Sequence, residues 1–166
     1  MGGQFNNAGF QPVRRDRLLQ EAVHDTYKTK GKLPEPALCP DCGAVFQDGR
    51  WQWLEKPKQA HQARCPACHR MHDNFPAGFV MLSGDFLAAH EAEILSVVRN
   101  HEAREKAEHP LQRVMNIEKS PDGWLVTTTD IHLARGIGDA LHHAYHGELE
   151  FHYNPQQNLL RVNWRR

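Results

Sequence analysis

The clearest alternation of apolar and polar positions lies in the second half of the chain, across residues 76–166. Apolar side chains near helical spacing predict a long helix over 85–108, whose last turns are almost wholly charged. A second helix is predicted over 130–146, with Asp130 as its N-cap and Gly147 in the position of a C-cap glycine. Two helices are thus expected in this part of the chain.

Four shorter stretches have the pattern of β-strands, with alternating apolar residues or many β-branched residues. They are 113–119, 124–129, 149–153 and 160–164. The tetrapeptide Ser120-Pro121-Asp122-Gly123 has the composition of a turn and would join the first two strands. The resulting order, α-β-β-α-β-β, predicts an α+β fold with an antiparallel sheet and helices on one face.

Two less regular segments precede this α+β domain. Residues 1–38 are rich in glycine and polar residues, which indicates a largely extended arm. The arm is basic, and residues 14–23 within it could form a short helix. Residues 39–75 hold all four cysteines and predict a small zinc ribbon. Trp51 and Trp53 within it alternate with polar residues, which suits a β-hairpin. The tryptophans would seal the ribbon or, if exposed, offer a stacking platform for bases.

The cysteines form two matched pairs, Cys39-Pro40-Asp41-Cys42-Gly43 and Cys65-Pro66-Ala67-Cys68, separated by 22 residues. A C-x2-C turn aims two thiolates at one point. Cys39, Cys42, Cys65 and Cys68 are therefore predicted to bind one zinc ion tetrahedrally. Four thiolates and one zinc leave a net negative charge. Arg64 and Arg70 beside the second pair could offset it, or be ordinary surface charges.

Other uses of the cysteines match their spacing less well. The chain begins without a secretory signal, which predicts a reducing compartment where two disulfides are disfavoured. A C-x2-C redox pair stays open as an alternative, and an iron–sulfur cluster uses the same ligands. His69 and His72 stand beside the second pair and could replace a cysteine, although four thiolates already complete a tetrahedral set.

The charge of the chain limits its partners. The 166 residues include 20 Lys/Arg and 20 Asp/Glu, a balance that argues against a general polyanion-binding protein. The charge is uneven, because residues 1–38 hold six basic and four acidic residues whereas 76–110 hold three and six. The amino-terminal side is thus the predicted face for nucleic-acid phosphates, with an ordinary solvated tail as the alternative. The candidate contacts are Arg14, Arg15, Arg17, Lys28, Lys30, Lys32, Arg64 and Arg70.

No catalytic constellation is evident in the sequence. The chain has no phosphate-binding loop, no nucleophile elbow and no cysteine beyond the two pairs. Asp130 and His132 could form an acid–base pair, but helix capping accounts for Asp130. No apolar stretch reaches the length of a membrane span. A non-enzymatic, cytoplasmic protein without membrane contact is therefore predicted.

The cysteine motifs belong to a wider resemblance. Together with Leu82-Ser83-Gly84-Asp85-Phe86 and the run from Thr127 to Leu149, they resemble a family of small bacterial zinc-ribbon proteins of unassigned function. More distantly, the order of elements over 39–154 is similar to the zinc-binding amino-terminal region of the nuclear export adaptor of the large ribosomal subunit and its archaeal relatives. That adaptor family carries more C-x2-C pairs. The resemblance therefore transfers only the four cysteines, as metal ligands.

These observations predict a non-catalytic zinc-binding module that associates with RNA or a ribosomal subunit. The alternatives are a zinc-dependent protein-interaction adaptor and a cysteine redox sensor.

Overall fold

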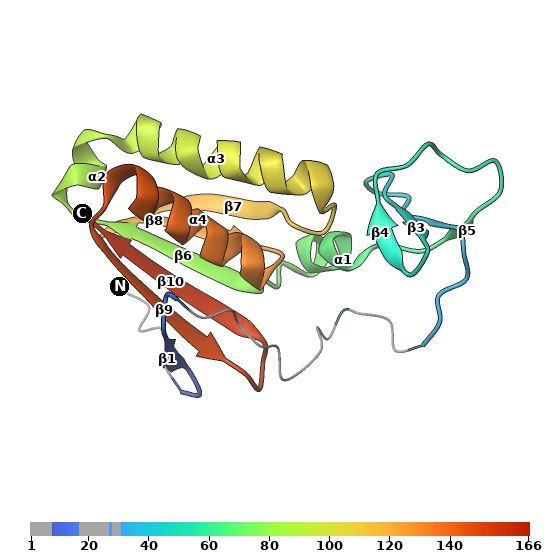
Figure 1. The fold of residues 1–166 in the computed structure, drawn as a ribbon, viewed down its shortest axis with the longest axis horizontal. Coiled ribbons are helices and arrows are strands. Elements are labelled where there is room, and N and C mark those ends of the chain that lie inside the picture. Colours follow the sequence, from blue (N-terminus) through green and yellow to red (C-terminus); the bar gives the residue numbers. More distant parts are fainter. Residues whose placement is uncertain (1–7, 17–26, 28–30) are drawn as a thin grey trace.

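A computed structural model describes residues 8–16, residue 27 and residues 31–166. Figure 1 shows a larger body, in which helices lie over one face of a sheet, and a smaller unit of short strands beside it. Helix α1 (Pro66–Asp73) lies between the two parts. The combination of helices and mixed sheets confirms the α+β class predicted from the sequence.

The larger body is built on a six-stranded sheet with the order β1-β9-β10-β6-β8-β7. Its strands are β1 (Gln11–Val13), β6 (Gly78–Ser83), β7 (Val114–Ser120), β8 (Gly123–Thr128), β9 (Glu148–Asn154) and β10 (Leu159–Arg165). All neighbouring pairs are antiparallel except β10 and β6, which are parallel. The expectation of a wholly antiparallel sheet was therefore wrong at one pair.

The parallel pair includes strand β6, which was not among the strands predicted from the sequence. Val80 and Leu82 are buried in the core, while Phe79 and Met81 alternate with them and are only partly buried. Because both faces of the strand carry apolar side chains, the period of two is hidden in a continuous apolar run. Strand β6 then takes a central place in the sheet, between β10 and β8.

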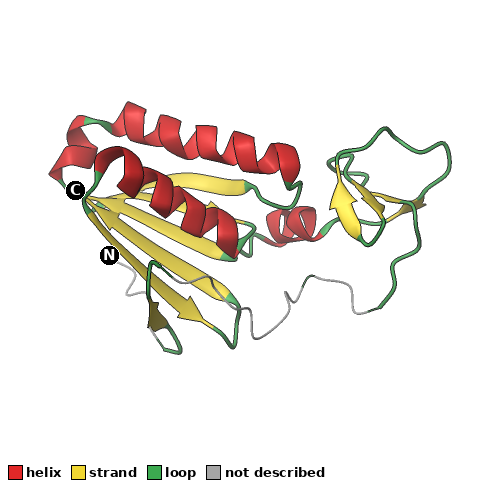
Figure 2. Ribbon diagram, viewed as in Figure 1, coloured by secondary structure: helices red, strands yellow, loops and turns green. Residues whose placement is uncertain are grey.

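Three helices lie on one face of the sheet, as Figure 2 shows: α2 (Asp85–Ala89), α3 (Glu91–Glu108) and α4 (Ile131–Tyr145). The single helix predicted over 85–108 is interrupted at His90, whose φ of −132° and ψ of 31° are not helical. The Asp130 carboxylate accepts hydrogen bonds from the amides of His132 (2.8 Å) and Leu133 (3.1 Å), which confirms it as the cap of α4. None of the described helices is both long and apolar enough to cross a bilayer.

The core between sheet and helices requires close approach of backbones. Gly78 on β6 faces α4, and a Cβ placed there would lie 2.4 Å from the Thr128 hydroxyl and 2.5 Å from the Ala134 Cβ. Glycine is therefore the residue that lets α4 cross β6 at this distance. Fully buried apolar side chains fill the rest of this layer; they include Val80, Leu82, Ile94, Val98, Ile137, Leu141, Val162 and Trp164.

The smaller unit, called the ribbon below, begins at Ala37, two residues before the predicted boundary. Its strands are β2 (Ala37–Leu38), β3 (Val45–Gln47), β4 (Arg50–Gln52) and β5 (His61–Gln62), in the order β4-β3-β2-β5. Strands β3 and β4 form a hairpin whose two turn residues, Asp48 and Gly49, have φ of 54° and 76°. Positive φ at both turn residues is typical of a two-residue hairpin.

The described part of the arm contacts the rest of the chain. Strand β1 pairs with β9, and the Arg15 carbonyl accepts a hydrogen bond of 2.8 Å from Arg135 on α4. The Tyr27 hydroxyl donates to the Asp73 carboxylate at 3.0 Å, at the end of α1. Most of the short helix considered over 14–23 lies outside the described residues.

Candidate metal centre

The four cysteines lie in two tight turns, one in the ribbon and one at the start of α1. After β2, the Gly43 amide donates to the Cys39 carbonyl at 2.9 Å, and Gly43 has φ of +82°, a conformation that favours glycine. Cys65 is the N-cap of α1 and is followed by Pro66, whose fixed φ suits a first helical position. Each turn therefore presents both of its sulfurs on one side.

The geometry of the sulfur atoms fits a single metal ion. All four Sγ atoms lie within 4.8 Å of one another, and those of Cys42 and Cys65 are 3.8 Å apart. In a tetrahedral site with metal–sulfur bonds of about 2.3 Å, neighbouring sulfurs are about 3.8 Å apart. None of the four cysteines is in a disulfide, and Cys39 and Cys65 are fully buried. The donor set is thus closed, soft and suited to a tetrahedral ion.

Backbone amides are directed at the sulfurs. The amide of Ala44 donates to Cys42 Sγ at 3.5 Å, that of Cys65 to Cys39 Sγ at 3.3 Å, and that of Cys68 to Cys65 Sγ at 3.4 Å. Such hydrogen bonds stabilise thiolates, because the N–H dipoles partly neutralise the charge on sulfur. The backbone of both turns is therefore arranged for deprotonated cysteines.

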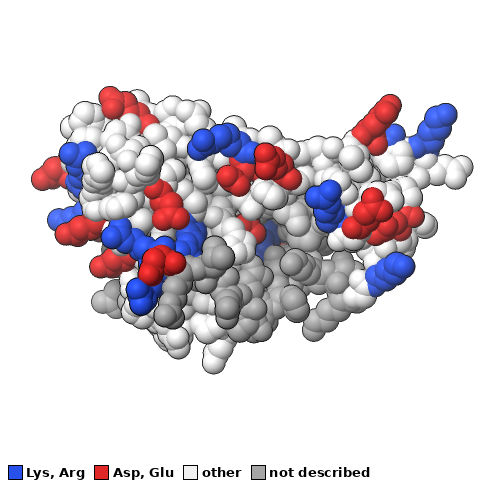
Figure 3. Space-filling model, viewed as in Figure 1, with Lys and Arg blue, Asp and Glu red and all other residues white. Residues whose placement is uncertain are grey.

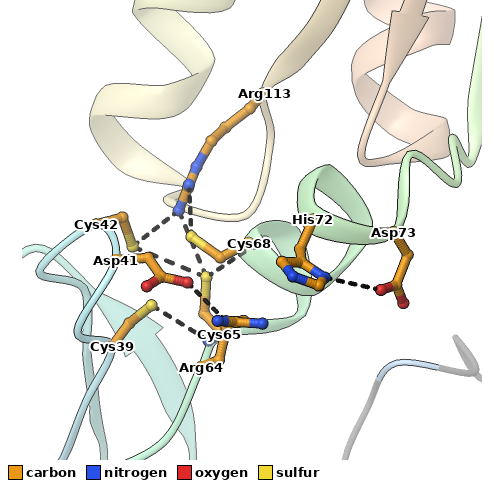
Figure 4. A network of polar contacts seen from close by, with 9 residues as sticks. All are labelled: Cys39, Asp41, Cys42, Arg64, Cys65, Cys68, His72, Asp73 and Arg113. Atoms are coloured by element: carbon orange, nitrogen blue, oxygen red, sulfur yellow. Dashed lines mark hydrogen bonds and ion pairs between the residues drawn. The ribbon is translucent and has the colours of Figure 1, made fainter.

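The main cation at this centre is Arg113, which comes from the loop between α3 and β7 in the α+β domain (Figure 4). Its guanidinium donates to Cys42 Sγ at 3.0 Å, to Cys68 Sγ at 3.1 Å and to Cys65 Sγ at 3.5 Å. A fourth hydrogen bond, of 2.8 Å, runs from its Nε to the Pro110 carbonyl. Only 6% of this side chain is exposed. Arg113 thus places one fixed positive charge against the sulfur cluster and ties the ribbon to the α+β domain.

The pKa values in the cluster follow from these contacts. The hydrogen bond from the Cys65 thiol lowers the pKa of Cys42 to about 4, assisted by the Ala44 amide and by Arg113. The same shared proton, together with burial, raises the pKa of Cys65, and burial raises the pKa of Cys68. Burial opposes the charge of Arg113, but hydrogen bonds to Cys68 and Cys42 raise its pKa overall. The cluster thus favours a thiolate at Cys42 beside a permanent guanidinium.

The two arginines beside the second cysteine pair, Arg64 and Arg70, were open between balancing the thiolates and being ordinary charges, and both have other partners in the structure. Arg64 forms an ion pair of 2.6 Å with Asp41 at the surface. Arg70 is 1% exposed, donates to the Phe75 carbonyl at 3.0 Å and lies 4.6 Å from the centre of the Tyr27 ring. Arg113 was missed because it lies 45 residues after Cys68, at the predicted start of a strand. Only the tertiary fold brings it to the cysteines.

The two neighbouring histidines lie outside the sulfur cluster. His69 is exposed, and His72 Nδ1 lies 3.1 Å from the Asp73 carboxylate at the surface. Figure 4 draws this pair apart from the cysteines. Hydrogen bonds from His72 and Tyr27 lower the pKa of Asp73. In the described residues, the four cysteines form the one group of His, Cys, Asp and Glu side chains arranged to hold a metal.

The residues predicted to contact nucleic acid do not form one patch. Arg14 pairs with Asp16 at 2.7 Å, Arg15 lies 2.9 Å from His142 Nε2, and Lys32 is exposed. Arg17, Lys28 and Lys30 lie outside the described residues. Arg70 is buried and so cannot reach a phosphate in solution, which corrects its prediction as a nucleic-acid contact. Figure 3 shows basic and acidic side chains interspersed over the visible face, without a continuous basic track.

The tryptophans of the ribbon have distinct environments. Trp51 packs against the cysteine cluster and lies 5.4 Å from Phe46, ring centre to ring centre. Trp53 is 38% exposed, and its indole N–H donates to the Lys106 carbonyl near the end of α3 at 2.6 Å. Both side chains therefore help to hold the ribbon: Trp53 is tied to α3 through its indole N–H, and Trp51 stays partly exposed beside the cysteines.

Comparison with known proteins adds no relative: no family model, no curated protein and no solved structure matches this chain. The chemistry assigned to the centre therefore rests on its own geometry.

Proposed function

We propose that the protein is a non-catalytic module in which Cys39, Cys42, Cys65 and Cys68 bind one structural zinc ion, and which associates with RNA. The closed four-sulfur set with Arg113 directed into it carries the zinc-binding part of this proposal. Four protein ligands complete a tetrahedral zinc shell and leave no position for a substrate or a reactive water, whereas catalytic zinc sites keep one position open. The metal then stabilises the arrangement of ribbon and α+β domain.

Zinc fits this centre better than an iron–sulfur cluster does. A cluster of several irons and sulfides has to fit between its cysteine ligands. The separation of 3.8 Å between Cys42 and Cys65 Sγ leaves room for a single ion only. Soft thiolate ligands in tetrahedral geometry favour zinc among the common single ions. Purified protein should hold one equivalent of zinc and lack the visible absorption of iron–thiolate centres.

The support for RNA association comes from the distribution of charge and from the accessible basic side chains. Arg14, Arg15 and Lys32 are exposed in the part of the chain where basic residues outnumber acidic ones. A chain with equal numbers of basic and acidic residues contacts few phosphates at once. We therefore expect recognition of a short single-stranded element rather than general binding along a duplex.

Capture of the tagged protein from cell lysate, with and without nuclease, tests this proposal. RNA association predicts that co-purifying ribonucleoprotein or ribosomal particles disappear after nuclease treatment and weaken steeply as salt rises. The double variant Arg14→Ala/Lys32→Ala should weaken capture. Arg99→Ala/Lys58→Ala, which removes two exposed cations elsewhere, should leave it unchanged.

Other outcomes would favour the alternatives. A partner that survives nuclease would favour a protein-interaction adaptor, for which Met71 (44% exposed) and Phe75 (50% exposed) on and after α1 supply apolar surface. Reversible disulfide formation without metal loss would favour a redox sensor. Absence of RNA at low salt would contradict the RNA proposal.

A further inference from the structure

A cleft of about 560 Å³ lies between the ribbon and the α+β domain. The β3–β4 hairpin forms one wall through Phe46, Arg50 and Trp51. The loop after α3 forms the other wall through His109 and Gln112. Figure 1 shows this hairpin beside the end of α3 and the start of α1. The volume falls within the range of about 300–1,000 Å³ that is typical of small-molecule sites.

The two walls of the cleft are joined through the cysteine cluster. Arg113 follows Gln112 in the same loop, and it donates to the sulfurs of Cys42 and Cys68. Trp51, on the opposite wall, packs against the cysteine cluster. The two walls are therefore held together by the same group of contacts, which makes the cleft a preformed feature of this fold.

The lining combines aromatic surface with a few polar groups. Trp51 and Phe46 supply two adjacent rings, and Leu111 and Pro66 extend the apolar surface. Arg50 and Gln112 project polar side chains, neither of which has a hydrogen-bond partner among the described residues. This composition suits a flat aromatic ligand that carries hydrogen-bonding edges and one negative charge.

We propose that this cleft binds a single unstacked nucleotide, with its base against Trp51 and Phe46, its edge at Gln112 and its phosphate at Arg50. An aromatic ring stacks on any base, an amide both donates to and accepts from a base edge, and a guanidinium binds phosphate. The lining holds one arginine and one aspartate, Asp130, so it does not suit a run of several phosphates. This inference rests on the proposed RNA association and specifies where one base of a single-stranded RNA lies.

The residues that line this cleft would also bind a free nucleotide. A binding experiment distinguishes a nucleotide within single-stranded RNA from a free one. The full-length, zinc-loaded protein is titrated into a labelled single-stranded RNA of about 12 nucleotides. Duplex RNA of equal length and nucleoside monophosphates serve as competitors. Binding of the single strand should be stronger than that of the duplex, because the bases of a duplex are already stacked and paired.

Variants of the two walls test the assignment. Trp51→Leu should weaken the single-stranded complex about tenfold, and Trp51→Phe should restore most of the affinity, because it keeps an aromatic face. Gln112→Ala, which does not touch the cysteines, should weaken RNA binding while the zinc content and the unfolding midpoint stay unchanged.

Arg50→Ala tests the phosphate contact. It should reduce the slope of log affinity against log salt by about 0.7, as expected for one lost phosphate contact on a single strand. Lys58→Ala is the matched control, since it removes an exposed cation of the ribbon that does not line the cleft.

The outcomes distinguish the cleft from the proposed function. If the wild type binds single-stranded RNA but Trp51→Leu and Gln112→Ala bind it equally well, the cleft inference is wrong and RNA association stands. If monophosphates bind in a Trp51-dependent way and RNA does not, the cleft is a nucleotide site and RNA association is wrong. If neither binds, both are wrong.

Discussion

Replacement of Arg113 by methionine would remove the cation that contacts the metal centre while keeping a side chain of similar length. The guanidinium donates to three of the four sulfurs, at 3.0, 3.1 and 3.5 Å, and the residue is 6% exposed. A zinc ion with four thiolates carries a formal charge of −2. Without Arg113, this charge would be held in a largely buried place with only amide dipoles to balance it.

The size of the effect follows from the burial of the contact. Hydrogen bonds to charged groups contribute about 1.5–3 kcal/mol each, and removal of one partner of a buried ion pair costs about 3–5 kcal/mol. The three sulfur contacts share one charge, so their energies are not additive. We therefore expect the free energy of zinc binding to fall by about 3–5 kcal/mol in total. This corresponds to a decrease of roughly two to four orders of magnitude in zinc affinity.

Competition with a chromophoric chelator measures that affinity directly. Arg64→Met is the matched control, because it removes the same charge from the residue next to Cys65. The ion pair of Arg64 with Asp41 is at the surface, so we expect the free energy of zinc binding to change by less than about 1 kcal/mol. Arg113→Lys should recover part of the loss, because lysine keeps the charge but not the branched donor geometry. If Arg113→Met binds zinc within about threefold of wild type, the role given to this residue is refuted.

Three further predictions concern the α+β domain. Gly78→Ala should lower the free energy of unfolding by about 1–3 kcal/mol in urea titrations, because the new methyl would lie 2.5 Å from the Ala134 Cβ; an unchanged midpoint would contradict the packing described. Asp130→Ala should lower the free energy of unfolding by about 1 kcal/mol, because α4 loses its N-cap. Asp130→Asn should keep most of the wild-type stability in the same urea titrations, because asparagine also caps helices. Burial lowers the pKa of His101, so the unfolded chain binds its proton more readily and stability decreases as the pH falls below about 6.5. His101→Gln should flatten this part of the profile of stability against pH. Burial raises the pKa of Asp139, so this residue adds stability as the pH falls further, and it does so equally in the wild type and in the variant.

The cysteine ligands could be predicted because their geometry is local. A C-x2-C turn brings two sulfurs together whatever the rest of the chain does, and only the meeting of the two turns requires the fold. Asp130 was predictable for the same reason, since a cap and the amides it accepts from are within three residues.

Arg113 and strand β6 could not be predicted because their roles depend on distant contacts. Nothing around Arg113 in the sequence distinguishes it from other arginines, and its partners lie 45 and 71 residues away. The apolar run of β6 fits a strand or a buried helix equally well, and its parallel pairing with β10 joins residues 78 and 160. The cleft between ribbon and domain depends on both the metal centre and this packing, so it too emerges only from the fold.

X-ray absorption at the zinc edge, combined with metal analysis of the purified protein, is the most direct test of the metal centre. We expect one zinc per chain with four sulfur neighbours at about 2.3 Å. Nitrogen or oxygen ligands in the first shell, substoichiometric zinc, or cysteines recovered as disulfides would contradict it.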